Sequence, residues 1–98
     1  MMKYLASICI FTATLLVPMS VLAKSGEQTY LQHCARCHGK DGDSVMPRAS
    51  NLKQKEGLRK PDAALLERIK KGGRICPSYD GILRDPEIVR LISHLRTL

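Results

Sequence analysis

The run Cys34-Ala35-Arg36-Cys37-His38 decides how the rest of the chain is interpreted. Two thiols three positions apart near a helix end can each add to one vinyl group of a haem, and the adjacent imidazole is then directed at the iron. A C-x-x-C-H spacing is therefore typical of covalent haem attachment. It predicts one haem c, joined through Cys34 and Cys37, with His38 as an axial ligand of the iron.

Two other interpretations compete for the same residues. A C-x-x-C pair can be a thiol redox centre, but such pairs usually follow a strand in a βαβ unit, and no strand pattern precedes Cys34. A zinc site needs four ligands, and His33 and His38 do not have the paired spacing of zinc fingers or ribbons. Haem attachment is the prediction, and these two remain as alternatives.

The first 23 residues have the pattern of an export signal. Lys3 precedes an apolar run that ends at Pro18, and a cleavage site can follow Ala23. We expect residues 1–23 to be a signal peptide and residues 24–98 to be one cytochrome c domain in the periplasm. The run is shorter than the roughly 20 residues of a spanning helix, so no stable membrane span is expected after removal. The alternative is that residues 1–23 stay attached as a membrane anchor. If the signal peptide is cleaved, Cys9 is removed with it.

The composition indicates that the domain needs a stabilising group. The chain of 98 residues has one Phe and no Trp, and only 4% of its residues are aromatic. Small domains with so little aromatic area usually depend on disulfides, a metal or a large cofactor. The cysteines beyond the signal are Cys34, Cys37 and Cys76, an odd number that does not fit a closed disulfide framework. A buried cofactor fits better.

Capping and breaker residues predict an all-α domain of about three helices with wrapping loops. The first helix should run from residue 25 or 26 to Cys34, with Ser25 as its N-cap. The second should start near Pro61 and end at the glycine pair at positions 72 and 73. The last should open with Asp85 as N-cap. Its apolar residues recur at helical spacing and predict a core face, namely Ile88, Leu91, Ile92 and Leu95.

From residue 26 to residue 98 the chain resembles a short class I c-type cytochrome. The residues that carry the resemblance are, in order, Gly26, Tyr30, Cys34, Cys37, His38, Gly39, Pro47 and Pro77. The resemblance implies a cytochrome c-like fold around one covalent haem. It also implies that the first and last helices cross, with Gly26 and Tyr30 against the face of Leu91 and Leu95. A backbone carbonyl near Pro47 would accept the Nδ1 proton of the proximal imidazole.

The resemblance fails at one functional position. The family's usual distal ligand is a methionine followed by proline, and this chain has Cys76-Pro77 there. We therefore expect His38 and Cys76 to be the axial pair, with a thiolate that stabilises ferric iron and lowers the reduction potential. Three alternatives stay open. The distal ligand could be Met46, or it could be His94. In the third alternative Cys76 is a small buried residue beside the haem, and the iron has no protein ligand on the distal side.

The function expected from these residues is single-electron transfer between redox partner proteins, without chemistry on a substrate. A haem subunit of a sulfur-compound (thiosulfate-type) oxidising enzyme and a haem-based small-molecule sensor are the alternatives. The lack of a carboxylate or histidine cluster beyond the ligands makes an enzyme less favoured. The formal charge of +7 favours partners with acidic docking surfaces. No basic run contains interleaved aromatic residues, so nucleic acid is not expected as a partner.

Overall fold

The computed structural model describes residues 13–16 and 23–98. These residues form four helices, α1 (Gly26–His33), α2 (Ala35–His38), α3 (Asp62–Lys71) and α4 (Asp85–Leu95), and contain no strand. The prediction of an all-α fold is confirmed, and α2 is a single turn in addition to the three expected helices. Most of the expected signal peptide lies outside the described residues. No helix in the described ranges has the length and apolar character that crossing a membrane requires.

The helix starts lie within one residue of the expected positions. At α1 the Ser25 hydroxyl accepts the Gln28 N–H at 3.1 Å, and the Gln28 side chain accepts the Ser25 N–H at 2.8 Å, which forms a capping box. At α4 the prediction was wrong by one residue, because Arg84 is the N-cap and Asp85 is already helical. The reason is Glu87, whose carboxylate contacts both the backbone N–H and the guanidinium of Arg84.

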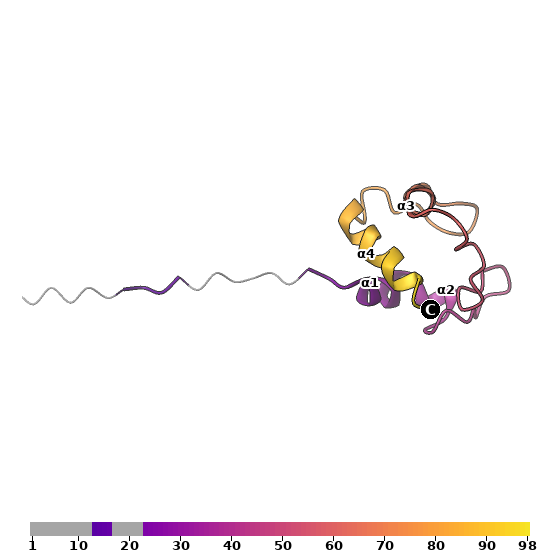
Figure 1. Ribbon diagram of the computed structural model, residues 1–98, viewed down its shortest axis with the longest axis horizontal. Coiled ribbons are helices and arrows are strands. Elements are labelled where there is room, and N and C mark those ends of the chain that lie inside the picture. Colours follow the sequence, from indigo (N-terminus) through magenta and orange to yellow (C-terminus); the bar gives the residue numbers. More distant parts are fainter. Residues whose placement is uncertain (1–12, 17–22) are drawn as a thin grey trace, which may run out of the picture.

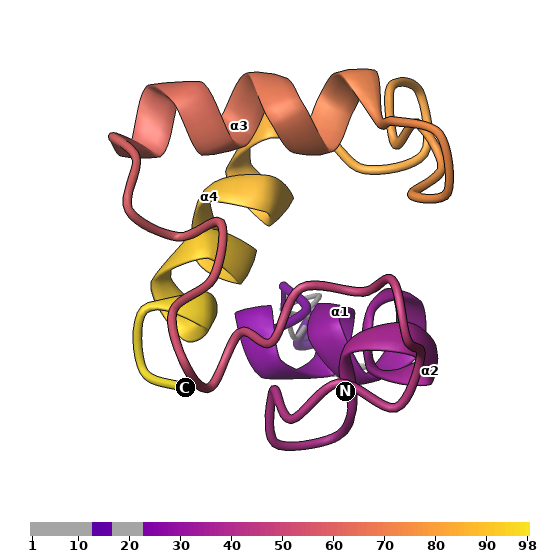
Figure 2. The same ribbon diagram turned by 90° about the vertical axis from the view of Figure 1, so that its right-hand side faces the viewer.

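Helices α1 and α4 pack closely against each other, as the resemblance implied. A methyl group added at Gly26 would collide with the carbonyl oxygen of Arg90 and would lie 3.1 Å from Cβ of His94. The rings of Tyr30 and His94 lie 5.2 Å apart at the same crossing. In Figure 2, α4 runs between α3 on one side and α1 with α2 on the other. Helix α4 therefore links the two ends of the domain.

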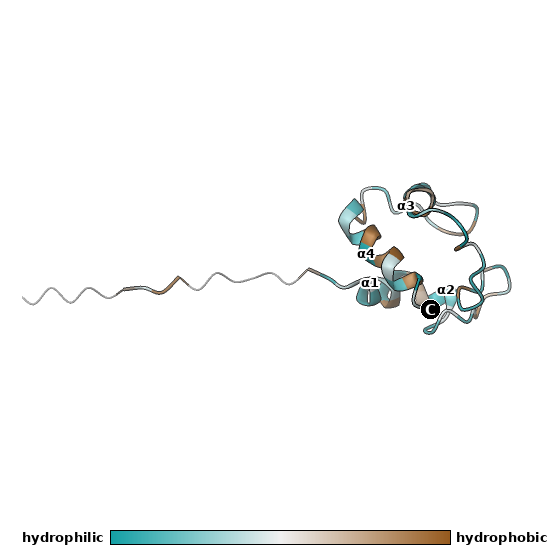
Figure 3. Ribbon diagram, in the orientation of Figure 1, coloured by the Kyte–Doolittle hydropathy of each residue, from teal (hydrophilic) through white to brown (hydrophobic). Residues whose placement is uncertain are grey.

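The core is built around the apolar face of α4. Ile88, Leu91, Ile92 and Leu95 are all buried, which confirms the predicted face. Figure 3 shows hydrophobic colour alternating with hydrophilic colour along α4. The other buried apolar side chains come from α1, α3 and the loops and are Tyr30, Leu52, Leu58, Leu65, Tyr79 and Leu83. Tyrosines are the aromatic residues of this core, so its aromatic area is small.

Residues 39–61 form a long connection without regular secondary structure between α2 and α3, as expected. Figure 1 shows this segment beside α2 and along the right-hand edge of the domain, and its last residues reach the C-terminal end of α4, where Arg96 donates to the carbonyls of Leu58 and Lys60. Gly39, Gly42 and Gly57 have positive φ values of 79°, 86° and 74°. These values are favourable for glycine, and the three residues turn the segment so that it wraps around the interior. The loop thus brings backbone groups near the attachment motif.

Candidate haem-binding site

The C-x-x-C-H motif lies where α1 passes into α2. Cys34 is the C-cap of α1, and its N–H donates to the Tyr30 carbonyl at 2.8 Å. The N–H of His38 donates to the Cys34 carbonyl at 3.0 Å, which closes the next turn. Cys34, Cys37 and His38 are all half-buried. The two thiols and the imidazole are therefore fixed on nearly continuous helical backbone, partly shielded from solvent.

The imidazole of His38 has one nitrogen engaged and one left for a metal. Its Nδ1 lies 2.9 Å from the carbonyl oxygen of Ser50. Because a carbonyl only accepts, Nδ1 carries the proton in this contact and Nε2 keeps its lone pair. An Nδ1–H bond to a backbone carbonyl is the usual way to fix the tautomer of a metal-binding histidine. The family resemblance predicted that a backbone carbonyl near Pro47 accepts this proton. The observed acceptor, Ser50, is three residues further along the chain.

Tyr30 connects the motif to the helix crossing. Its hydroxyl donates to the Gly39 carbonyl at 2.5 Å, and the side chain is fully buried. Burial and, next, the neighbouring Cys34 raise the pKa of Tyr30 to about 12. Gly39 itself could not carry a side chain, since a methyl group there would collide with the backbone of Asp43. The end of the motif is thus held between α1 and the following turn.

The structure brings Cys76 to the same place as the motif. Its thiol lies next to the His38 imidazole, and this contact lowers the pKa of Cys76. The same contact, as the largest cause, raises the pKa of His38. All four residues singled out from the sequence, Cys34, Cys37, His38 and Cys76, therefore come together, although a long stretch of chain separates Cys76 from the others.

The rival distal ligands are placed differently. The backbone N–H of Met46 donates to the Cys37 carbonyl at 3.3 Å, and its side chain is 46% exposed. The His94 ring lies against Tyr30 at the crossing of α1 and α4, with the two ring planes tilted by 52°. The structure gives neither of them the contact with the His38 imidazole that Cys76 has.

The protonation of Cys34 bears on the thiol redox alternative. Burial, followed by the charges of Cys76 and Cys37, raises the pKa of the Cys34 thiol to about 12. Reactive cysteines of redox pairs have the opposite property, a depressed pKa. Within the described part of the chain, the three cysteines, Cys34, Cys37 and Cys76, are free thiols. The described residues also contain no group of three or more His, Cys, Asp or Glu side chains that could hold a bare metal ion.

The surroundings of the four residues fit a haem. Cys34 and Ala35 pack against the hydrophobic core, together with Leu66, Ile69 and Leu98. Tyr79 has its ring 5.4 Å from that of His33, and its hydroxyl donates to the His33 carbonyl at 3.0 Å. Apolar side chains beside two thiols, one oriented imidazole and one further sulfur fit a porphyrin, because the thiols can attach it and the imidazole and the further sulfur can bind its iron.

Two contributors were not found from the sequence. Ser50 acts through its backbone carbonyl, which any residue type would offer, so no sequence signal marks it. Arg68 is one of many basic residues between positions 53 and 74, and nothing in the sequence distinguishes it from the others. Its place beside the Cys76 loop depends on how α3 packs, and helical periodicity alone does not reveal that.

Comparison with protein families matches residues 21–95 to the family described as cytochrome C oxidase, cbb3-type, subunit III. The chain belongs to this family. The cbb3-type subunit III family is a family of c-type cytochrome domains, so the chain is a c-type cytochrome, as its motif predicted. Such domains bind haem c covalently and use it in electron transfer. Comparison with curated proteins found no match.

Proposed function

We propose that this c-type cytochrome is an exported electron carrier with one haem, attached through Cys34 and Cys37 and ligated by His38 and Cys76. The haem, when bound, supplies one-electron chemistry between ferric and ferrous iron. The chain's own residues attach it, orient it and set its potential. The observation that carries the proposal is that the Cys76 thiol faces the His38 imidazole, whose Nδ1 is already bonded to the Ser50 carbonyl.

Each ligand has a separate effect on the redox behaviour. The Nδ1–H bond to Ser50 holds the imidazole in the tautomer that presents Nε2, and it makes that nitrogen a stronger donor. A Cys76 thiolate that bound the iron would add a negative charge, which would favour ferric over ferrous iron. We therefore expect a lower reduction potential than a histidine and methionine pair would give.

The axial pair is tested by spectroscopy of the ferric protein. Cys76→Ala should lose the low-spin electron paramagnetic resonance signal of a thiolate-ligated haem, and Cys76→Met should stay low-spin with a higher reduction potential. Met46→Ala is the matched control and should leave the spectrum and potential unchanged. Spectra that respond to Met46 and ignore Cys76 would make Met46 the ligand.

The compartment and the number of haems are tested together by mass. We propose that residues 1–23 are removed on export to the periplasm, where haem is attached. Protein from the periplasmic fraction should then have the mass of residues 24–98 plus one haem. A mass that includes residues 1–23, or one without haem, would contradict this.

A second function follows from the cysteine at position 76, where a methionine is usual. The chain would then be a haem subunit of a thiosulfate-type enzyme, with the sulfur of Cys76 taking part in sulfur-compound oxidation. Turnover of thiosulfate together with extra sulfur mass on Cys76 would support this function. A matured protein that is inert to thiosulfate but exchanges electrons rapidly with a partner cytochrome would support the carrier.

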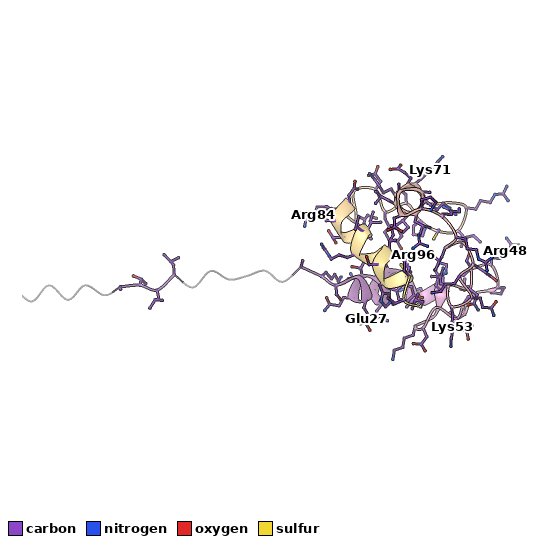
Figure 4. All side chains as sticks on the ribbon, viewed as in Figure 1. Glu27, Arg48, Lys53, Lys71, Arg84 and Arg96 are labelled. Atoms are coloured by element: carbon purple, nitrogen blue, oxygen red, sulfur yellow. The ribbon has the colours of Figure 1, made fainter. Side chains whose placement is uncertain are left out.

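The partners are proposed to be redox proteins with acidic surfaces, and a terminal oxidase is one class that the family description suggests. Figure 4 shows that the labelled basic residues Arg48, Lys53, Lys71 and Arg84 lie on different sides of the domain. The positive charge is thus spread widely. Long-range attraction of an acidic partner, weakening as salt rises, is what such a distribution supports.

A further inference from the structure

The loop that carries Cys76 is bound to the end of α3. The N–H of Gly73 donates to the Cys76 carbonyl at 2.9 Å and closes a tight turn. Beyond the thiol, the Ser78 hydroxyl donates to the Lys70 carbonyl at 2.6 Å. The last turn of α3 and the Cys76 loop therefore keep a fixed relation, so a side chain on that turn can act on Cys76 from a defined place.

Arg68 is the side chain on α3 that reaches this loop. A methyl group added at Gly73 would lie 2.5 Å from Nη2 and 2.7 Å from Nη1 of Arg68. The guanidinium therefore lies directly on the Gly73 backbone, in space that a larger residue would fill. After the contact with His38, which is the largest cause, the charge of Arg68 also lowers the pKa of Cys76.

The positive charge of Arg68 is not neutralised within residues 13–16 and 23–98. No hydrogen bond or ion pair among those residues engages its guanidinium, whereas Lys70, two positions along, pairs with Asp85 at 3.1 Å. An unpaired guanidinium beside the sulfur loop acts on that sulfur with its full charge, reduced only by solvent and salt.

On the basis of the proposed His38 and Cys76 ligation, we propose that Arg68 is a positioning residue that raises the reduction potential through its charge beside the Cys76 thiolate. Reduction adds an electron to an iron centre that already has an anionic ligand. A nearby cation stabilises that more negative state and therefore favours the ferrous form. Arg68 thus offsets part of the lowering that the thiolate itself causes.

The test is the midpoint potential of the matured protein and three variants. Arg68→Gln should shift the reduction potential downward. Arg68→Lys should keep the potential close to the wild-type value, because lysine retains the positive charge. Lys71→Gln is the matched control, since Lys71 is an exposed cation on the same helix and does not act on the Cys76 thiol. The shift in Arg68→Gln should shrink at high salt, as expected of an exposed charge.

Gly73→Ala provides an independent test, because it keeps the positive charge of Arg68 and moves the guanidinium away from the Gly73 backbone. Its methyl group would displace the flexible guanidinium, and the φ of Gly73 lies outside the left-handed region, so alanine fits the backbone. This variant should also lower the potential. In the Arg68→Gln background the same substitution should add nothing, because the group it displaces is gone.

The outcomes separate this inference from the assignment of the ligand. Equal potentials in Arg68→Gln and Lys71→Gln, with a Cys76-dependent spectrum, would overturn the role of Arg68 alone. If Arg68→Lys had a potential as low as that of Arg68→Gln, Arg68 would act through packing and not through its charge, which also overturns the proposal. A ferric spectrum that is unchanged in Cys76→Ala would refute the thiolate ligand, and the proposal for Arg68 would fail with it.

Discussion

At the scale of single residues, Tyr30 links the helix crossing to the attachment motif through one hydrogen bond. Its buried hydroxyl donates to the Gly39 carbonyl, directly after His38. Tyr30→Phe removes this donor and leaves the Gly39 carbonyl with the Gly42 N–H alone, at 3.2 Å, which should cost about 0.5–1.5 kcal/mol of stability. Denaturant unfolding of the matured protein measures this cost. A variant as stable as the wild type would show that the Gly42 donor is sufficient for this carbonyl.

The same residue predicts a dependence on pH. The pKa of Tyr30 rises from 10.0 to about 12 on folding, chiefly through burial and then through Cys34. The folded state therefore holds this proton more tightly than the unfolded state does. Its contribution to stability is full below pH 10 and is lost as the pH rises towards 12. Unfolding midpoints measured across this range should fall more steeply for the wild type than for Tyr30→Phe, and parallel curves would contradict the prediction.

At the scale of helices, the crossing of α1 and α4 depends on the absence of a side chain at Gly26. A methyl group there meets the Arg90 carbonyl, which belongs to a helix and has little freedom to move. Gly26→Ala should therefore destabilise the protein by about 1–3 kcal/mol, despite the better helix propensity of alanine. Gln32→Ala, exposed on the same helix, is the control and should be nearly neutral. The measurement is the denaturant midpoint of both variants.

The elements also show what the sequence could and could not predict. The apolar face of α4 and the N-cap at Ser25 follow from local residue types, so they were predicted correctly. The turn α2 was missed, because four residues carry too little periodicity to be recognised. The Ser50 carbonyl and the guanidinium of Arg68 reach the site through long-range packing, and no local pattern encodes such contacts.

At the scale of the whole molecule, Arg96 fastens the long 39–61 connection to the end of α4. Its guanidinium donates to the carbonyls of Leu58 and Lys60 and pairs with Asp62 at 2.8 Å. Arg96→Gln should break this network and cost about 1–3 kcal/mol of stability, because at least one part-buried carbonyl loses its donor. Arg84→Gln, whose side chain is 87% exposed, is the control and should cost less than about 1 kcal/mol. Equal costs would mean that Arg96 is only a surface charge.

The domain as a whole should depend on its haem for folding. Residues 24–98 contain only two aromatic residues, Tyr30 and Tyr79, and little apolar area is available to offset the conformational entropy lost on folding. The long loop has few apolar residues of its own to pack, and the haem would supply the missing apolar surface. The double variant Cys34→Ser and Cys37→Ser, which cannot form the thioethers, should therefore have low helix content by circular dichroism and no cooperative unfolding transition. The matured wild type is the control, and a haem-free chain that unfolds cooperatively with the same helix content would show that the polypeptide alone is sufficient.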